Sequence, residues 1–215
     1  MFKDRKDAGI QLAKKLIGYK NKNVVVLAIP RGGLPLGAIV AEALNAPLDI
    51  ILTKKIGHPL NKEFAIGAVS LQGKYVADSA EATHRYIEEE TRRIRKILRQ
   101  RQDQYYKNFA PKILKDKIVI VVDDGVATGS TILATVSLIK EEEPSKIVVA
   151  FPVGSSSAIN RLYNSPFIDE VVCIEVPKHF NAVGQFYRNF NPVLDKKAMQ
   201  ILKESNKHFI VSKYE

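Results

Sequence analysis

The sequence contains a single cysteine and no apolar run that approaches the length of a membrane-spanning helix. Cys173 cannot form an internal disulfide, and its apolar neighbours in residues 171–174 predict a buried thiol. A membrane-spanning helix requires roughly 20 consecutive apolar residues, so we do not expect a membrane protein. Residues 1–7 are largely charged and no apolar stretch follows them, so we expect no secretory signal and a cytoplasmic location.

Acidic residues are also in the minority. The 33 lysines and arginines outnumber the 23 aspartates and glutamates, which gives a formal net charge of +10. Three explanations stay open: binding of nucleic acid, binding of a polyphosphorylated small molecule in a basic cleft, and plain surface solvation. A basic run at residues 92–96 falls on a predicted helix, where a solvated face is the favoured interpretation.

Two common phosphate-binding patterns are missing. The sequence has neither the Gly-x-x-x-x-Gly-Lys pattern of a Walker A loop nor the Gly-x-Gly-x-x-Gly pattern of a dinucleotide site. A kinase or phosphatase acting on sugar phosphates would also need a nucleotide loop or a nucleophile that we do not find. Any phosphate chemistry must therefore use a different kind of loop.

What the sequence does contain is an alternation of short apolar runs with helical segments. This pattern is typical of a parallel sheet covered by helices on both faces. The predicted strands are residues 24–29, 48–53, 117–122, 146–151 and 170–174. The predicted helices are residues 34–44, 130–143 and 156–163. The sequence thus predicts an α/β fold with a mostly parallel, twisted sheet, in a single domain over residues 1–215.

Residues 57–110 interrupt the alternation. Residues 63–76 predict a small antiparallel excursion with a turn at Gln72 and Gly73. A long helix is expected over residues 79–106, with Asp78 as its N-cap.

The most informative segment is residues 119–131. A β-branched strand ends in the acid pair Asp123 and Asp124, and the chain then passes through a small, hydroxylated turn into a helix. That turn consists of Ala127, Thr128, Gly129, Ser130 and Thr131. Backbone N–H groups at the start of a helix form an anion site, and ligands of open α/β sheets bind at the carboxyl ends of strands. Because the carboxylates would repel a phosphate, we expect them to face the hydroxyls of a neighbouring polyol such as ribose.

This segment resembles the signature with which type I phosphoribosyltransferases bind 5-phosphoribosyl-1-pyrophosphate (PRPP). The resemblance implies that Asp123 and Asp124 hold the ribose 2- and 3-hydroxyls and that residues 127–131 hold the 5-phosphate. It also implies Mg²⁺, bound near the two aspartates mostly through water, and a homodimer. Gly125 is a departure, because the family usually carries a larger aliphatic residue there.

Two more loops follow predicted strands. The backbone N–H groups of Gly32 and Gly33, with the guanidinium of Arg31, would suit a diphosphate. The family's pyrophosphate loop lies at this position, often with a non-proline cis peptide, so the peptide next to Arg31 is a candidate for one. Lys54 and Lys55 match the place of a basic residue that reaches the pyrophosphate in the family. Residues 57–63 are placed like its mobile, site-closing loop.

Residues 175–192 resemble the hood of hypoxanthine-guanine phosphoribosyltransferases, in which an aromatic residue stacks on the purine. Phe180 is then the stacking candidate, and the backbone near Lys178 and Val183 is the candidate for contacts with the base edge. For Phe186, Tyr187 and Phe190 we expect packing of the hood on the core instead.

The phosphate loop points to a different subfamily. Ala127 stands where 6-oxopurine enzymes carry an aspartate that manages the proton of the purine. A general acid must then come from elsewhere, and Glu63 beside the mobile loop is the candidate. The acceptor therefore stays unassigned.

The resemblance to uncharacterised bacterial and archaeal phosphoribosyltransferases spans nearly the whole chain, through residues 4–9, 30–33, 63–69 and 182–187. It implies a glycosyltransferase that displaces pyrophosphate from PRPP with a nitrogenous base. The alternative is a non-catalytic regulator that senses PRPP or a nucleotide and binds RNA or DNA through a basic face.

Overall fold

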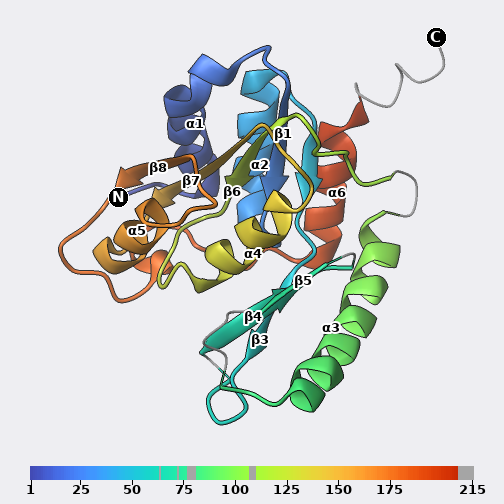
Figure 1. The fold of residues 1–215 in the computed structure, drawn as a ribbon. Coiled ribbons are helices and arrows are strands. Elements are labelled where there is room, and N and C mark those ends of the chain that lie inside the picture. The colour runs from blue at the N-terminus through green and yellow to red at the C-terminus, as the bar shows by residue number, and fades with distance from the viewer. Residues whose placement is uncertain (63, 72, 77–80, 107–109, 208–215) are drawn as a thin grey trace.

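The computed structural model describes residues 1–62, 64–71, 73–76, 81–106 and 110–207 of the 215-residue chain. Its centre is a five-stranded parallel sheet in the order β2-β1-β6-β7-β8 (Figure 1). The strands are β1 (Val24–Ala28), β2 (Leu48–Ile50), β6 (Ile118–Val122), β7 (Lys146–Val153) and β8 (Glu170–Glu175). The predicted α/β fold with a parallel sheet is confirmed.

Helices cover both faces of this sheet, because its central strands are apolar on both sides. Alternate residues of β1 face different cores: Val24 and Val26 face one, and Val25 and Leu27 face the other. The first core is closed by α1 (Arg5–Leu16), α2 (Gly33–Leu44) and α6 (Asp195–Ser205), and the second by α4 (Ser130–Lys140) and α5 (Ser156–Tyr163). None of the described helices combines the length and apolar character that crossing a membrane requires.

An inserted module carries a second sheet. Three antiparallel strands, β3 (Lys54–Gly57), β4 (Ala65–Val69) and β5 (Lys74–Val76), are covered by the long helix α3 (His84–Tyr105). Its small core includes Ile56, Ile66 and Leu98. The predicted antiparallel excursion is thus confirmed, and it begins earlier than expected.

Several predicted boundaries were wrong. The second strand ends at Ile50 rather than at residue 53, because Lys54 and Lys55 already pair with β4 of the second sheet. Helix α3 begins at His84 with Thr83 as its N-cap, so the prediction of a cap at Asp78 fails; Asp78 itself lies outside the described residues. Asp and Thr are both good caps, and here the Thr83 side chain accepts from Tyr86 N.

Three further helical features differ from the prediction. Helix α4 ends at Lys140, three residues before the predicted end, and Glu143 already has a φ of 54°. Helices α1 and α6 lie outside the elements predicted from the sequence. Cys173 is half-buried rather than buried, with its thiol donating to the Glu175 carbonyl, and burial raises its pKa to about 11.

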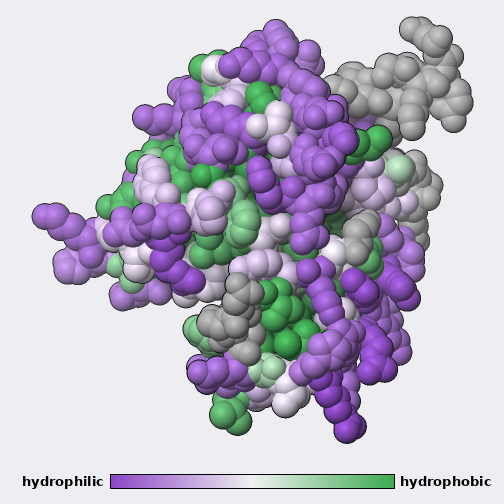
Figure 2. Space-filling model, in the orientation of Figure 1, coloured by the Kyte–Doolittle hydropathy of each residue, from purple (hydrophilic) through white to green (hydrophobic). Residues whose placement is uncertain are grey.

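The basic run of α3 lies on a solvated face. Figure 2 shows hydrophilic side chains over the outer surface of this helix. Arg92, Arg93 and Lys96 are exposed, whereas Ile94 between them is fully buried. The guanidinium of Arg93 pairs with Glu90 of the same helix at 2.7 Å. These contacts fit the favoured interpretation of the run as a solvated helix face.

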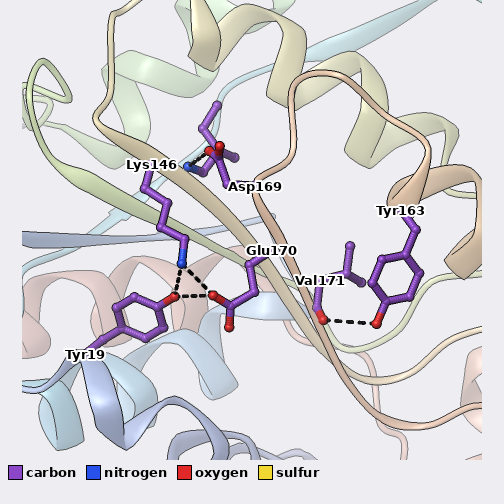
Figure 3. Close-up of polar contacts among 7 residues, drawn as sticks. Tyr19, Lys146, Tyr163, Asp169, Glu170 and Val171 are labelled. Atoms are coloured by element: carbon purple, nitrogen blue, oxygen red, sulfur yellow. Dashed lines mark hydrogen bonds and ion pairs between the residues drawn. The ribbon is translucent and has the colours of Figure 1, made fainter.

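An ionic cluster marks the amino ends of the strands. Lys146, the first residue of β7, donates to the Tyr19 hydroxyl at 2.7 Å and to Glu170 Oε2, at the start of β8, at 2.6 Å (Figure 3). The hydrogen bonds from Lys146 and Tyr19 lower the pKa of Glu170. These side chains hydrogen-bond to one another and hold the start of β7 to the start of β8. The cluster lies at the edge of the sheet opposite the acid pair, and therefore away from the candidate site.

Candidate functional site

The loops that follow β1 and β6 lie side by side. The two strands are neighbours in the sheet, and Ile29 N donates to the Val122 carbonyl at 2.9 Å. A side chain on Gly33 would place its Cβ 2.5 Å from that same carbonyl oxygen, so this position has room only for glycine. The structure therefore brings the predicted pyrophosphate loop against the end of β6 and the acid pair, which precede the predicted phosphate cradle of residues 127–131.

The acid pair occupies the turn directly after β6. Asp124 N donates to Asp123 Oδ1 at 2.9 Å, a hydrogen bond between neighbouring residues within the turn. Burial raises the pKa of the Asp123 carboxyl, and the neighbouring charge of Asp124 raises it further. Burial also raises the pKa of Asp124, but the guanidinium of Arg5 opposes that effect. Asp124 is therefore the member of the pair whose carboxylate has a direct cationic partner.

Arg5 is a site residue that the sequence-based prediction missed. Its Nε and Nη2 atoms lie 2.9 and 2.8 Å from Asp124 Oδ2, although the two residues are 119 positions apart. Both side chains are largely buried. The motif that contains Arg5, at residues 4–9, was the only signal, since a contact over this separation leaves no local pattern.

The phosphate cradle is held from the side of α5. Ser155 Oγ donates to the Ala127 carbonyl at 2.6 Å, and Arg161 Nη1 donates to the Thr128 carbonyl at 2.8 Å. In a trans peptide the N–H points opposite to the C=O, so the N–H groups of Thr128 and Gly129 point away from α5. Gly129 has a φ of 74°, a left-handed conformation that favours glycine, and α4 begins directly after it.

The loop after β1 contains the expected unusual peptide. The bond between Pro30 and Arg31 is cis, at the position where the resemblance predicts a non-proline cis peptide. Arg31 Nη1 lies 3.2 Å from Asp195 Oδ2 at the start of α6, and both side chains are about half exposed. Gly32 follows as the N-cap residue of α2.

The predicted residues of the inserted module lie in a different setting. Lys54 and Lys55 are half-buried in β3 rather than in a loop directly after β2. Lys54 contributes, after Arg93 and Lys62, to lowering the pKa of Glu90 on α3. Glu63, the predicted general acid, lies outside the described residues.

The hood packs on the acid pair. The Tyr187 hydroxyl donates to the Asp124 carbonyl at 2.6 Å, and Tyr187 is buried. The side chain of Val183 occupies the space above Gly125, where a Cβ would lie 2.6 Å from Val183 Cγ1. The departure from a larger aliphatic residue at position 125 thus has a physical reason.

The predicted base-contacting residues are arranged along the hood. Phe180 is half-buried, and its ring centroid lies 5.3 Å from that of Phe186. Lys178 is exposed. Phe186, Tyr187 and Phe190 all pack on the core, as expected. Phe180 packs against the same core and against Phe186, so its stacking role stays a prediction.

The amino-terminal segment is hydrogen-bonded to the hood. Phe2 N donates to the Phe186 carbonyl at 2.8 Å, and Arg188 N donates to the Phe2 carbonyl at 2.9 Å. Asn189 N donates to the Lys3 carbonyl at 3.0 Å. Phe2 itself is 1% exposed. Residues 2–5 therefore contact both the hood and the acid pair.

Comparisons with known proteins agree with this architecture. The phosphoribosyl transferase domain family matches residues 2–191. A Mycobacterium tuberculosis protein, whose name assigns it provisionally as a phosphoribosyl transferase, is 37% identical over 214 residues, which cover 97% of this chain and 48% of that protein. The chain thus spans about half the length of the curated relatives it matches.

Solved structures show the same fold. The crystal structure of TT1426 from Thermus thermophilus has a TM-score of 0.88 and 39% identity, over 94% of this chain and 98% of that chain. The AQ2163 protein from Aquifex aeolicus has a TM-score of 0.52 and 17% identity, over 84% of this chain and 78% of that chain, which is a likeness of fold alone. The family match and these relatives show that the chain belongs to the phosphoribosyl transferase domain family.

Proposed function

We propose that the chain transfers the 5-phosphoribosyl group of PRPP to a nitrogenous base and releases pyrophosphate. The observation that carries this proposal is the meeting of the loops after β1 and β6 at one edge of the sheet. The acid pair follows β6, the cradle leads into α4, and the glycines after β1 lie against both the Val122 carbonyl and the Asp124 carboxylate. Membership of the phosphoribosyl transferase domain family supports it.

Each loop has a chemical task in this proposal. The N–H groups and hydroxyls of residues 127–131 bind the 5-phosphate at the start of α4, where the helix dipole favours an anion. Asp123 and Asp124 accept hydrogen bonds from the ribose hydroxyls. Arg31, Gly32 and Gly33 bind the pyrophosphate, and Lys54 and Lys55 reach it from β3.

The reaction needs no covalent nucleophile on the protein. The base displaces pyrophosphate at the anomeric carbon of the ribose, and the anomeric centre carries positive charge as that bond breaks. Holding both substrates in line supplies much of the rate enhancement, and buried carboxylates stabilise the developing charge. The carboxylates of Asp123 and Asp124 are suitably placed for this, because they are largely buried at the end of β6.

Mg²⁺ is part of the proposal. No group of three or more metal-ligating side chains occurs among the described residues, which fits an ion bound mainly by water and substrate oxygens. Asp123 and Asp124 would hold it, and its charge would neutralise the departing pyrophosphate.

We assign base binding to the hood, with Phe180 stacking on the base and the backbone near Lys178 and Val183 at the base edge. Ala127 offers no carboxyl group to the base, so Glu63 is proposed as the acid. The acceptor is left open for this reason.

A pyrophosphate-release assay over a panel of purine and pyrimidine bases tests the activity. Asp124→Asn should keep the fold and lose PRPP affinity in calorimetry, because it removes the charge and leaves the shape. Asp103→Asn, an equal charge change on the exposed face of α3, is the matched control and should bind PRPP normally. Unchanged PRPP binding by Asp124→Asn would reject the cradle assignment.

The same assay distinguishes the enzyme from the regulatory alternative. Turnover with any base rejects a purely non-catalytic role, whereas PRPP binding without turnover, together with a salt-sensitive RNA or DNA gel shift, would favour it. The cytoplasmic location and the homodimer are also proposals, and sedimentation at several concentrations tests the second.

A further inference from the structure

The guanidinium of Arg5 contacts three residues in two distant parts of the chain. Its Nε and Nη2 atoms bind Asp124 Oδ2, and its Nη1 donates to the Asn191 carbonyl at 2.7 Å. The guanidinium carbon lies 3.9 Å from the centroid of the Phe190 ring. The side chain is only 11% exposed. One guanidinium therefore joins the acid pair to the carboxyl end of the hood.

Each of these contacts uses a different property of the guanidinium. Two N–H groups converge on a single carboxylate oxygen, a third reaches a carbonyl, and the flat face lies over an aromatic ring. Lysine has one compact charge and no planar fork, so it could satisfy the carboxylate but not the whole set. This distinction makes Arg5→Lys an informative variant.

The backbone around Arg5 repeats the same connection. Phe2 and Lys3 form backbone hydrogen bonds with residues 186–189 of the hood. Asp4 caps α1 by accepting from Asp7 N at 2.9 Å, so the helix fixes the position of Arg5 at its first turn. Movement of the hood relative to the acid pair would therefore have to break or rearrange contacts of Arg5.

The carboxylate that Arg5 holds has little freedom of its own. The Cα of Gly32 lies so close that an added Cβ would sit 2.1 Å from Asp124 Oδ2. The Tyr187 hydroxyl binds the carbonyl of the same residue at 2.6 Å. With Arg5 on the same carboxylate oxygen, Asp124 is fixed in one orientation between the pyrophosphate loop and the hood.

We propose that Arg5 is a positioning residue that couples the hood to the donor site: it orients Asp124 for the ribose hydroxyls and orders residues 183–191 at the same time. This inference rests on the proposed function, because it assigns Asp124 to the donor. It predicts that donor binding and hood order change together when Arg5 is altered. A residue with only a structural role would lower stability without linking these two properties.

Two measurements on the full chain test the coupling. Hydrogen exchange of residues 183–191 in the ligand-free protein reports hood order, and calorimetry with PRPP reports donor affinity. In Arg5→Lys we expect faster hood exchange and a PRPP Kd raised about tenfold, the loss expected for one charge-assisted hydrogen bond. Arg5→Ala should show a larger change in both, so that lysine rescues part of the alanine effect.

Two further variants control the experiment. Phe190→Leu removes the stacked ring but keeps the ion pair. We expect hood exchange and the PRPP Kd to rise less than in Arg5→Ala. This variant tests the coupling even where Arg5→Ala fails to fold. Lys6→Ala, an exposed charge on the same helix, should leave both measurements at the wild-type value.

The outcomes separate this proposal from the proposed function. Wild-type PRPP affinity and hood exchange in Arg5→Lys and Arg5→Ala would overturn the coupling. So would a loosened hood with unchanged PRPP affinity, which would make Arg5 structural only. If the wild-type protein binds no PRPP, the proposed function fails, and the exchange of the ligand-free variants still shows whether Arg5 orders the hood.

Discussion

A methyl group on Gly32 would lie 2.1 Å from Asp124 Oδ2. Gly32 has a φ of −62° and a ψ of −37°, which any residue can adopt, so the requirement for glycine is one of space. The pyrophosphate loop and the acid pair thus lie in direct contact at Gly32, where no side chain fits.

Gly32→Ala should therefore weaken PRPP binding markedly, because the carboxylate has to rotate away from its position. We expect a stability loss of about 1–3 kcal/mol from the crowding. Calorimetry and urea denaturation measure the two effects. Gly18→Ala is the matched control, since a Cβ there meets nothing within 4 Å; equal effects of the two variants would contradict the steric explanation.

Gly125→Ala should destabilise the protein through Val183. The added Cβ would lie 2.6 Å from Val183 Cγ1 and 3.1 Å from Val153 Cγ1. We expect a loss of about 1–3 kcal/mol in urea denaturation, with part of it recovered in the double variant with Val183→Ala. Strict additivity of the two substitutions would show that the hood does not rest on Gly125.

Ser155→Ala should loosen the phosphate cradle and α5 together. Ser155 Oγ donates to the Ala127 carbonyl and accepts from Ala158 N at 3.1 Å as the N-cap. Loss of an N-cap costs about 1–2 kcal/mol, and the free carbonyl should also weaken PRPP binding. Ser156→Ala, one position on and exposed, should change neither the melting temperature nor the PRPP Kd.

Tyr106→Phe should destabilise the protein in a pH-dependent way. The Tyr106 hydroxyl donates to Asp49, which is 3% exposed. Burial raises the pKa of Asp49, and the hydrogen bond from Tyr106 lowers it again. Without the hydroxyl the pKa of Asp49 rises further, so the ionised carboxylate becomes more costly.

The sign follows from the raised pKa. A carboxyl whose pKa is higher in the folded protein stabilises the fold below its unfolded value, 3.8, and loses that contribution as the pH rises through the folded value. The cost of Tyr106→Phe should be small near pH 4 and about 1.5–3 kcal/mol near neutral pH. Urea denaturation at both pH values measures it, with Tyr163→Phe as control, since its hydroxyl lies 3.5 Å from the Val171 carbonyl (Figure 3). A loss that does not vary with pH would contradict the assignment.

The core of the fold could be predicted because its signal is local. Residues 24–28 and 118–122 are consecutive apolar, β-branched-rich runs, which in a parallel sheet are buried on both faces. The cradle was predictable for the same reason: strand, acid pair, small turn and helix are contiguous in sequence.

Features that depend on distant contacts escaped prediction. The motif at residues 4–9 contains Arg5 but does not reveal its partner, because Asp124 is 119 positions away. Lys54 and Lys55 carry no strand pattern of their own, and their place in β3 is set by pairing with Val69 and Ala68. Thr83 caps α3, and the residue type alone could not single it out, because aspartate and threonine are both suitable caps.

The carboxylate of Asp49 also accepts from Lys112 N at 2.6 Å, where the chain returns from the inserted module, while the module departs just beyond Ile50. The two ends of the inserted module therefore both lie at the side chain of Asp49. The entropic cost of closing a loop grows only slowly with the number of residues in it. The central sheet can thus accommodate a module of different length at this position, provided that Lys54 and Lys55 of β3, which we assign to the pyrophosphate, are kept.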